Sequence, residues 1–225
     1  YLDSLPSDEA RRLSRQVLSA SDVAAHGITA EFTHAWRIAE RAREFIRAHR
    51  DRDFLLIVSI DEPHHPFIAP EPYAGAFEDF LFPVPNADDD LSNKPRSQRE
   101  WARHTASHRS GLMRAGDRTA LRHPRHFGCN SFCDSQVGRV LEVIDAETPG
   151  ALVIHTSDHG DMFGSHGLFG KGPCMYEEIT RIPFIVRWPG AAPVGAVSKG
   201  LVSHIDLVPT VLEYFGVPAP DILQG

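Results

Sequence analysis

In the stretch ALVIHTSDHGDMFGSHGLFGKG, residues 151–172, an apolar segment runs directly into a polar, glycine-rich one. The segment Ala151 to Ser157 is rich in apolar and β-branched residues, which is typical of a strand covered on both faces. In α/β proteins, ligands bind beyond the carboxyl ends of such strands. The polar residues at 158–172 are therefore the first candidates for a functional site.

Helices and strands alternate on both sides of this stretch. The apolar periodicity predicts helices over 31–49, from an Asn130 cap to the TPG at 148–150, near 175–180, and over 207–216 after an Asp206 cap. Short apolar runs predict strands over 54–60, 151–157 and 182–188. Residues 1–25 give a weak helical signal, and 73–125 are expected to form loops with a short polar helix. The alternation predicts an α/β layered domain with a central, mainly parallel sheet, treated as one domain over 1–225.

Composition and charge exclude several classes of partner. The net charge of −7 argues against a general binder of nucleic acid or anionic membranes, so an anionic substrate must be attracted locally. No run approaches the roughly 20 apolar residues of a membrane span. The 3 cysteines do not suggest a disulfide framework, which favours a reducing, cytoplasmic compartment, with one bridge plus a free thiol as the alternative. Because the start at Tyr1 resembles a cut, a secreted or periplasmic location stays open.

The loop at 158–172 carries the strongest candidates for chemistry. Asp158 and His159 follow the strand directly and can both bind a divalent cation, although a polar turn is the alternative for this pair alone. Lys171 lies between glycines, where its ammonium can approach a small oxyanion, unless it is a solvated surface lysine. His166 is a candidate for substrate contact or for shaping the loop.

A second loop, 61–72, follows the predicted strand 54–60 and is rich in proline, which limits its backbone freedom. Its His64 suits a general acid aimed at a leaving oxygen, while a structural, hydrogen-bonded histidine is the alternative. Because both loops follow strands, we treat them as parts of one site.

Other polar features favour structural roles. Cys129 and Cys133 lie one helical turn apart and are expected to be core or helix-end thiols. The ADDD at 87–90 is expected to cap a helix or face solvent. The RHPRH at 122–126 could help to hold an anion, but a surface position is favoured.

Several motifs together resemble a known family. In chain order, PHHPF (63–67), DSQVGRVLEVI (134–144), TSDHGDMFGSHGLFGKG (156–172), MYEEITRIPFIVRWPG (175–190) and SHIDLVPTVLEYFGV (203–217) resemble the sulfatases of the alkaline phosphatase superfamily, from about residue 53 to the end. The resemblance implies an alkaline phosphatase-like layered fold and a hydrolase of sulfate monoesters acting on a small-molecule or carbohydrate sulfate. It implies that Asp158 and His159 bind a divalent metal, with calcium expected first and manganese or magnesium as alternatives. His64 and Lys171 match the family's pair that binds the sulfuryl oxygens and assists the departing alcohol.

The resemblance also shows what the chain lacks. The family's formylglycine nucleophile arises from a C/S-x-P-x-R motif, and further acidic metal ligands lie near the family's N-terminus; neither occurs here. We therefore expect the chain to be an incomplete part of a sulfatase-like protein, inactive by itself. Two alternatives remain open. The Asp-His pair also occurs in related phosphonate monoester and phosphodiester hydrolases, and a catalytically silent metal- or anion-binding domain would need no nucleophile.

Overall fold

The computed structural model describes residues 29–106, 112–113 and 117–225. The weak helical signal predicted over 1–25 therefore lies outside the described residues. The chain divides into two compact units, one drawn from 1–148 and 157–182 and the other from 149–156 and 183–225. All of the candidate site residues belong to the first unit.

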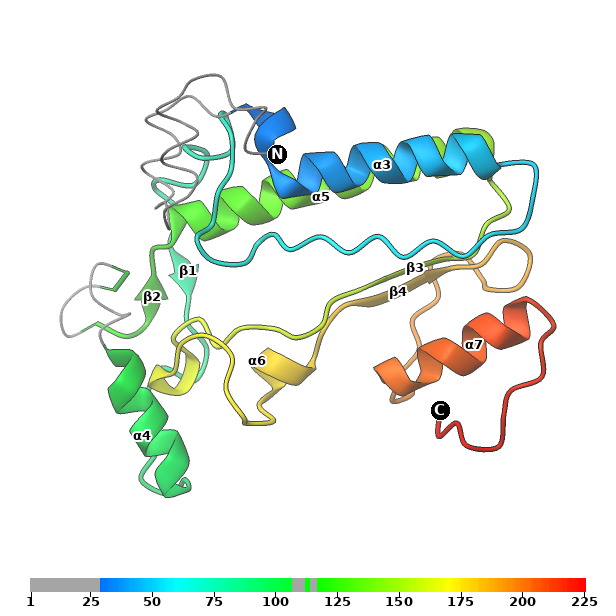
Figure 1. Ribbon diagram of the computed structural model, residues 1–225. Helices are drawn as coiled ribbons and strands as arrows, with labels where there is room; N and C mark the ends of the chain where they lie inside the picture. The colour runs from blue at the N-terminus through cyan, green and yellow to red at the C-terminus, as the bar shows by residue number, and fades with distance from the viewer. Residues whose placement is uncertain (1–28, 107–111, 114–116) are drawn as a thin grey trace. The chain divides into compact units, whose positions relative to one another are not determined.

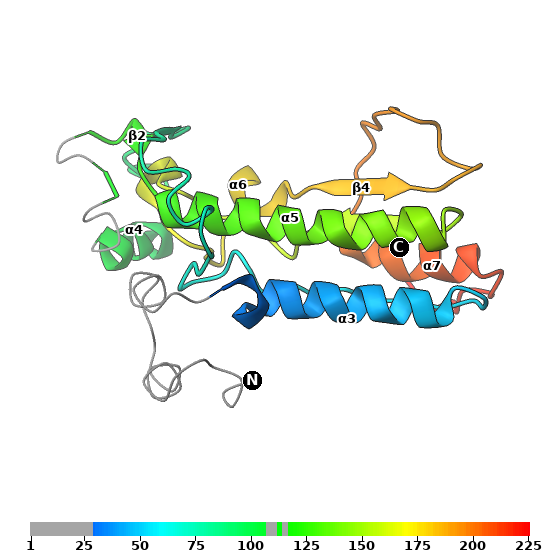
Figure 2. The same cartoon turned by 90° about the horizontal axis from the view of Figure 1, so that it is seen from above.

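The first unit is built on a pair of long helices, α3 (His34–His49) and α5 (Pro124–Glu147), which lie side by side and run in the same direction (Figures 1 and 2). The Thr33 hydroxyl caps α3 by accepting a hydrogen bond from the Trp36 amide at 3.3 Å. One apolar stripe of α3 is buried against α5: Ala35, Ala39, Ala42 and Ile46. The helix predicted over 31–49 is confirmed, and a short 3-10 turn, η2 (Ala30–Phe32), precedes it.

Helix α5 begins earlier than the sequence predicts. Asn130 does not cap it but lies inside it, and His123 occupies the N-cap position with Pro124 in the first turn. Proline is favoured there because its fixed φ suits a helix and its missing N–H would have no helical partner. The predicted start at Asn130 is therefore wrong, although the end near the TPG is confirmed.

The segment 54–60 runs back beside the helix pair as an extended trace (Figure 1). Phe54, Leu56 and Val58 pack on the α3–α5 core, whereas Ile57 between them is 81% exposed. The segment joins no strand ladder in the part of the chain that the structure describes. The prediction of a strand covered on both faces is thus wrong for this segment, because only its helix-facing side is covered.

The remainder of the first unit contains short elements. Strands β1 (Phe82–Pro83) and β2 (Ala120–Leu121) pair antiparallel. Helix α4 (Arg96–His104) is the short polar helix expected within 73–125. A 3-10 turn, η4 (Ser165–Gly167), lies inside the glycine-rich loop, and α6 (Glu177–Thr180) follows it within the predicted range 175–180.

The second unit combines a strand pair with one helix. Strands β3 (Val153–Thr156) and β4 (Phe184–Arg187) lie where the sequence predicts them, but they pair antiparallel. Among the described residues both strand pairs are antiparallel, so the expected mainly parallel sheet does not form within them. Helix α7 (Leu207–Tyr214) is confirmed, with Pro209 in its first turn and Gly216 beyond its end. Asp206 is the N-cap residue of α7, as predicted, but its carboxylate accepts from the Ser203 amide at 2.7 Å in the capping box of the preceding 3-10 turn η5 (His204–Asp206).

Two sequence-level expectations concern the whole chain. All 3 cysteines lie in the described residues and are free, so the alternative of one disulfide bridge is wrong. Cys129 is buried in the core, as predicted. Within the described ranges, no helix combines the length and the apolar character needed to cross a membrane.

Candidate functional site

The loop 158–172 is held in place by its own apolar side chains. Met162 and Leu168 are fully buried with Leu91 and Ile179, and Phe169 is buried in a neighbouring cluster. Backbone hydrogen bonds close the loop, including Met162 N–H to the Gly170 carbonyl at 3.1 Å. The loop is therefore a packed element that presents polar residues from fixed positions.

Gly160 fixes the start of this loop against α6. Its amide donates to the Ile179 carbonyl at 2.8 Å, and a Cβ at Gly160 would lie 2.0 Å from the Glu178 carbonyl oxygen. Such a contact is far inside van der Waals distance, so only glycine allows this approach. Close backbone packing therefore requires a glycine at position 160.

Asp158 and His159 lie together at the start of the loop. Asp158 Oδ2 is 3.1 Å from His159 Nε2, and His159 Nδ1 is 2.9 Å from the Gly160 carbonyl oxygen. Because a carbonyl oxygen only accepts, Nδ1 carries the proton in the neutral ring and Nε2 offers a lone pair toward the carboxylate. Histidines that bind metals commonly donate their other N–H to a carbonyl in this way. Partial burial raises the pKa of Asp158, but hydrogen bonds and the His159 charge outweigh it and lower the pKa overall.

This pair fits part of a metal site. Two electron-pair donors facing each other across 3.1 Å favour a cation beside them, and the Asp158 side chain is 80% exposed and open to further ligands. Within the described ranges, no group of three or more histidine, cysteine, aspartate or glutamate side chains could hold a metal ion. Metal binding by Asp158 and His159 therefore stays a prediction, and further ligands would have to complete the site.

Lys171 is exposed at the far end of the same loop. Burial raises the pKa of Asp161, whereas the charges of His159 and Lys171 act on that carboxyl in the opposite direction. Lys171 and His159 thus both lie within electrostatic reach of Asp161. The adjacent Gly172 packs closely against the indole of Trp101 in α4. A Cβ at Gly172 would lie only 2.6 Å from that ring.

His64 is an exposed residue in the proline-rich loop 61–72. Its Nδ1 is 2.9 Å from the His65 carbonyl oxygen, so Nε2 is the ring atom that can exchange a proton with a substrate. The loop is anchored at both ends to α5 by thiols: Cys133 Sγ lies 3.5 Å from the Glu62 carbonyl oxygen and Cys129 Sγ lies 3.3 Å from that of Ile68. Burial raises the pKa of Cys129 to about 12 and that of Cys133 to about 11, so both are neutral donors.

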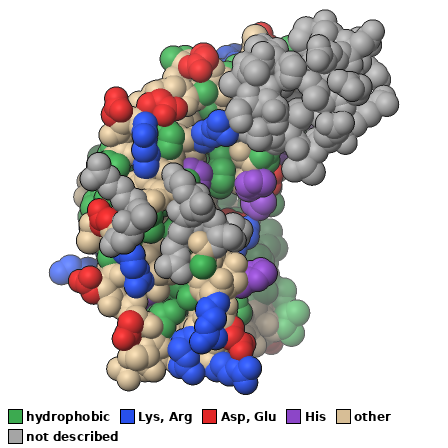
Figure 3. Space-filling model, turned by 90° about the vertical axis from the view of Figure 1, so that its left-hand side faces the viewer, with side chains coloured by type: hydrophobic (Ala, Val, Ile, Leu, Met, Phe, Trp, Pro, Cys, Tyr) green, Lys and Arg blue, Asp and Glu red, His purple; other side chains and the backbone are tan. Residues whose placement is uncertain are grey.

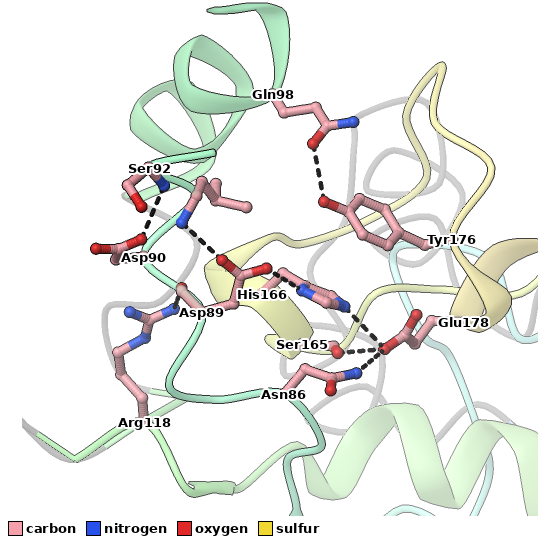
Figure 4. A network of polar contacts seen from close by, with 11 residues as sticks. Asn86, Asp89, Asp90, Ser92, Gln98, Arg118, Ser165, His166, Tyr176 and Glu178 are labelled. Carbon is pink, nitrogen blue, oxygen red and sulfur yellow. Dashed lines mark hydrogen bonds and ion pairs between the residues drawn. The ribbon is translucent and has the colours of Figure 1, made fainter. Parts of the chain in front are cut away.

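His166 lies between two carboxylates (Figure 4). Its Nδ1 is 2.6 Å from Asp89 Oδ2, its Nε2 is 3.5 Å from Glu178 Oε1, and its ring stacks on Tyr176. The His166 side chain is only 12% exposed. Asp89 therefore neither caps a helix nor simply faces solvent, as the sequence suggests for 87–90, but binds the glycine-rich loop.

An open pocket of about 450 Å³ lies beside this network. Its lining residues are Pro85, Asn86, His166, Tyr176, Glu177, Glu178 and Arg181. The acidic side chains that line it are already engaged: Glu178 accepts from Asn86 at 3.0 Å, and Glu177 pairs with Arg181 at 3.5 Å. These contacts favour the loop-shaping role of His166 over a direct contact with an anionic substrate.

Sequence reasoning missed two histidines near the site. His123 and His126 in RHPRH are favoured as surface residues by the sequence, but their rings pack between the two loops against Phe67 and Phe163. The only sequence signal was the density of histidines just before a predicted helix. Their contacts join loops about a hundred residues apart, which local patterns do not reveal.

The first unit also carries local positive charge despite the net charge of −7. Helix α4 contains Arg96, Arg99 and Arg103. Figure 3 shows lysine and arginine side chains gathered at the lower end of the visible face. Trp101 is the α4 residue that packs against Gly172, and helical spacing places these arginines on the opposite face of α4.

Comparison with known proteins gives a consistent result. The sulfatase family model matches residues 8–217. The uncharacterized sulfatase YidJ of Escherichia coli K12 is 41% identical over the whole of this chain, which covers 44% of that protein. The multifunctional alkaline phosphatase superfamily protein PehA of Trinickia caryophylli is 28% identical over 88% of the chain, which covers 41% of that protein. The chain thus spans less than half the length of these curated relatives.

A solved structure agrees in fold. A protein crystallised with its substrate, D-glucosamine-2-N,6-O-disulfate, superposes with a TM-score of 0.66 over 85% of this chain and 50% of its own length, at 23% identity. The likeness confirms the predicted alkaline phosphatase-like α/β fold, of which this chain forms one part.

Proposed function

The chain belongs to the sulfatase family, and on that premise we propose that the protein to which it contributes hydrolyses sulfate monoesters. The single observation that carries the proposal is the packed loop 158–172, which presents Asp158 and His159 at one end and Lys171 at the other. A cation-binding pair and an ammonium on one rigid loop suit a compact, highly charged ester group.

Asp158 and His159 are proposed as two ligands of a divalent cation, with calcium as the first candidate and manganese or magnesium as alternatives. When bound, this cation would offset the negative charge of the sulfate group. The Gly160 carbonyl holds the His159 ring in the tautomer whose Nε2 can bind the metal. The remaining ligands and the formylglycine nucleophile are expected in parts of the protein outside these 225 residues.

Lys171 is proposed to bind a sulfuryl oxygen and His64 to protonate the departing alcohol oxygen through Nε2. The Lys171 ammonium stabilises negative charge on the group being transferred. The bond from His64 Nδ1 to the His65 carbonyl keeps Nε2 directed away from its own backbone. His166 is proposed to shape the loop through Asp89 and Glu178 rather than to touch the substrate.

The substrate class is proposed to be a small-molecule or carbohydrate sulfate. The structural relative that was solved with D-glucosamine-2-N,6-O-disulfate supports a sulfated sugar as one candidate.

The test is an assay of the complete protein on 4-nitrophenyl sulfate, before and after treatment with a metal chelator. We expect turnover that the chelator abolishes and that added calcium or manganese restores. Turnover that survives chelation with no loss would contradict the proposed roles of Asp158 and His159.

Phosphodiester or phosphonate monoester hydrolysis is the second candidate activity. The Asp-His pair and the similarity to PehA, named as a multifunctional protein of the superfamily, favour it. A third candidate, a catalytically silent domain, would require the complete protein to lack a C/S-x-P-x-R segment. Sequencing of the region before Tyr1 decides that question without any assay.

A further inference from the structure

Four aromatic rings join the two loops of the candidate site. Phe67 comes from the loop 61–72, Phe163 comes from the loop 158–172, and His123 and His126 come from the start of α5. The Phe67 ring centroid lies 4.8 Å from that of His123 and 5.1 Å from that of His126. The Phe163 centroid lies 4.4 Å from that of His126 and 6.5 Å from that of His123. Both loops therefore pack on the same two imidazoles.

The backbone at both phenylalanines indicates that these contacts are enforced. Phe67 has φ +58° and Phe163 has φ +43°, both in the left-handed region that bulky residues rarely adopt. Such conformations persist only where the surrounding structure determines them, and they are common at functional sites. The residue from each loop that touches the histidine pair thus carries backbone strain.

The histidines act here as uncharged aromatic rings. His126 Nδ1 is buried and has no hydrogen-bond partner among the described residues. Burial, with a contribution from His123, lowers the pKa of His126 to about 4. Burial also lowers the pKa of His123, and the charges of Arg125 and His65 act in the same direction. A charged ring is therefore disfavoured between the two phenylalanines.

We propose that His123 and His126 are positioning residues that set the His64 loop against the loop carrying Asp158, His159 and Lys171. In this role neither imidazole contacts the substrate. The pair fixes the distance between the proton donor on one loop and the anion-binding group on the other. This inference rests on the proposed function for its catalytic consequence, but the structural coupling of the loops can be measured separately.

The first test uses the complete protein and two substitutions at one position. His126→Ala removes the ring, and we expect kcat/KM for 4-nitrophenyl sulfate to fall about 100-fold, the effect of a misplacement of about 1 Å. His126→Phe keeps the ring and removes the unpaired nitrogen, and we expect near wild-type turnover at neutral pH. As pH falls toward about 4, the wild-type enzyme should lose activity through His126 protonation, whereas His126→Phe should keep more of it.

The second test measures hydrogen exchange in the same variants. The reporters are the Phe67 amide, bonded to the His64 carbonyl, and the Met162 amide, bonded to that of Gly170. In His126→Ala both amides should exchange faster, and in His126→Phe neither should. His49 provides the matched control, because its ring stacks on Phe45 in α3 at 3.9 Å, and His49→Ala should leave both amides and the pH profile unchanged.

The outcomes separate the two proposals. Wild-type exchange at both reporters in His126→Ala would overturn the positioning role, as would a His126→Phe variant as impaired as His126→Ala. If the wild-type protein hydrolyses no sulfate or phosphate ester, the proposed function fails, and the exchange experiment still decides whether the histidine pair couples the loops.

Discussion

At the scale of single residues, one backbone carbonyl oxygen orients each of the two candidate histidines. The Gly160 carbonyl selects the tautomer of His159, and the His65 carbonyl does the same for His64. In both rings a backbone oxygen holds one nitrogen, so the other nitrogen is presented for chemistry. Lys171, by contrast, is exposed, and its proposed role rests on its charge.

Replacement of Lys171 tests the anion-binding role. Lys171→Met keeps much of the side-chain length but removes the ammonium, and kcat/KM for an aryl sulfate should fall by about 100- to 1,000-fold, because a group that stabilises developing charge is lost. Lys199→Met, which removes another exposed ammonium, should leave steady-state kinetics unchanged. Equal effects of the two substitutions would argue against a specific role for Lys171.

Replacement of Asp158 tests the metal-binding role. Asp158→Ala removes one of the two proposed ligands and should weaken binding of calcium or manganese at least 10-fold, as measured by calorimetric titration of the complete protein. Asp221 is exposed near the end of the chain, and Asp221→Ala should bind metal as the wild type does. Unchanged affinity in Asp158→Ala would place the metal elsewhere.

At the scale of elements, local patterns predict what local forces determine. Helix α3, the positions of β3 and β4, and α7 follow from apolar periodicity and short apolar runs, and the structure confirms them. The segment 54–60 resembles a strand in composition, but pairing depends on distant partners, so its sequence could not show that only one side is covered. The start of α5 was misplaced because Asn130 has cap chemistry, while Pro124 in fact begins the helix.

The same limit applies to the candidate site. The placement of Asp158, His159 and Lys171 in one loop after a strand could be predicted from the sequence, whereas their roles stay predictions. The partnership of His166 with Asp89, and that of His126 with two phenylalanines, join segments far apart in the chain. Such contacts depend on tertiary packing, which a single sequence does not reveal.

The packing of Gly160 on α6 gives an element-scale prediction. Gly160→Ala would place a methyl group 2.0 Å from the Glu178 carbonyl oxygen, so the loop must move and the protein should lose about 1–3 kcal/mol of unfolding free energy. Gly138 in α5 has open space around it, and Gly138→Ala should instead gain up to about 1 kcal/mol. Urea unfolding of both variants measures the difference, and a harmless Gly160→Ala would contradict the close packing.

The contact between Asp89 and His166 predicts a dependence of stability on pH. The His166 hydrogen bond, followed by that from the Leu91 amide, lowers the pKa of Asp89 below its ordinary value of 3.8. A carboxyl with a lowered folded-state pKa contributes its full stability above its unfolded pKa and loses it as pH falls through the folded pKa. Stability from this contact should therefore be complete at pH 7 and lost below about pH 4.

Asp89→Asn provides the measurement for this contact. The variant should be less stable at pH 7 by about 1–2 kcal/mol, because a hydrogen bond to a charged group is lost, and the loss should shrink in acid. Urea unfolding at pH 7 and at pH 3.5 compares the two proteins. A constant difference across this range would show that ionisation of Asp89 contributes nothing.

At the scale of the whole molecule, the chain spans less than half the length of its curated relatives. Its net charge is −7, and Lys171 is an exposed positive charge at the end of the glycine-rich loop. The proposed attraction of an anion is therefore local to the candidate site.

The central claim is that this site acts on sulfate monoesters. The most direct measurement compares kcat/KM of the complete, metal-loaded protein for 4-nitrophenyl sulfate and for bis(4-nitrophenyl) phosphate, which share a leaving group. We expect faster turnover of the sulfate and the loss of that turnover in Lys171→Met. Faster turnover of the phosphodiester would be the contrary result and would assign the protein to the sister activity.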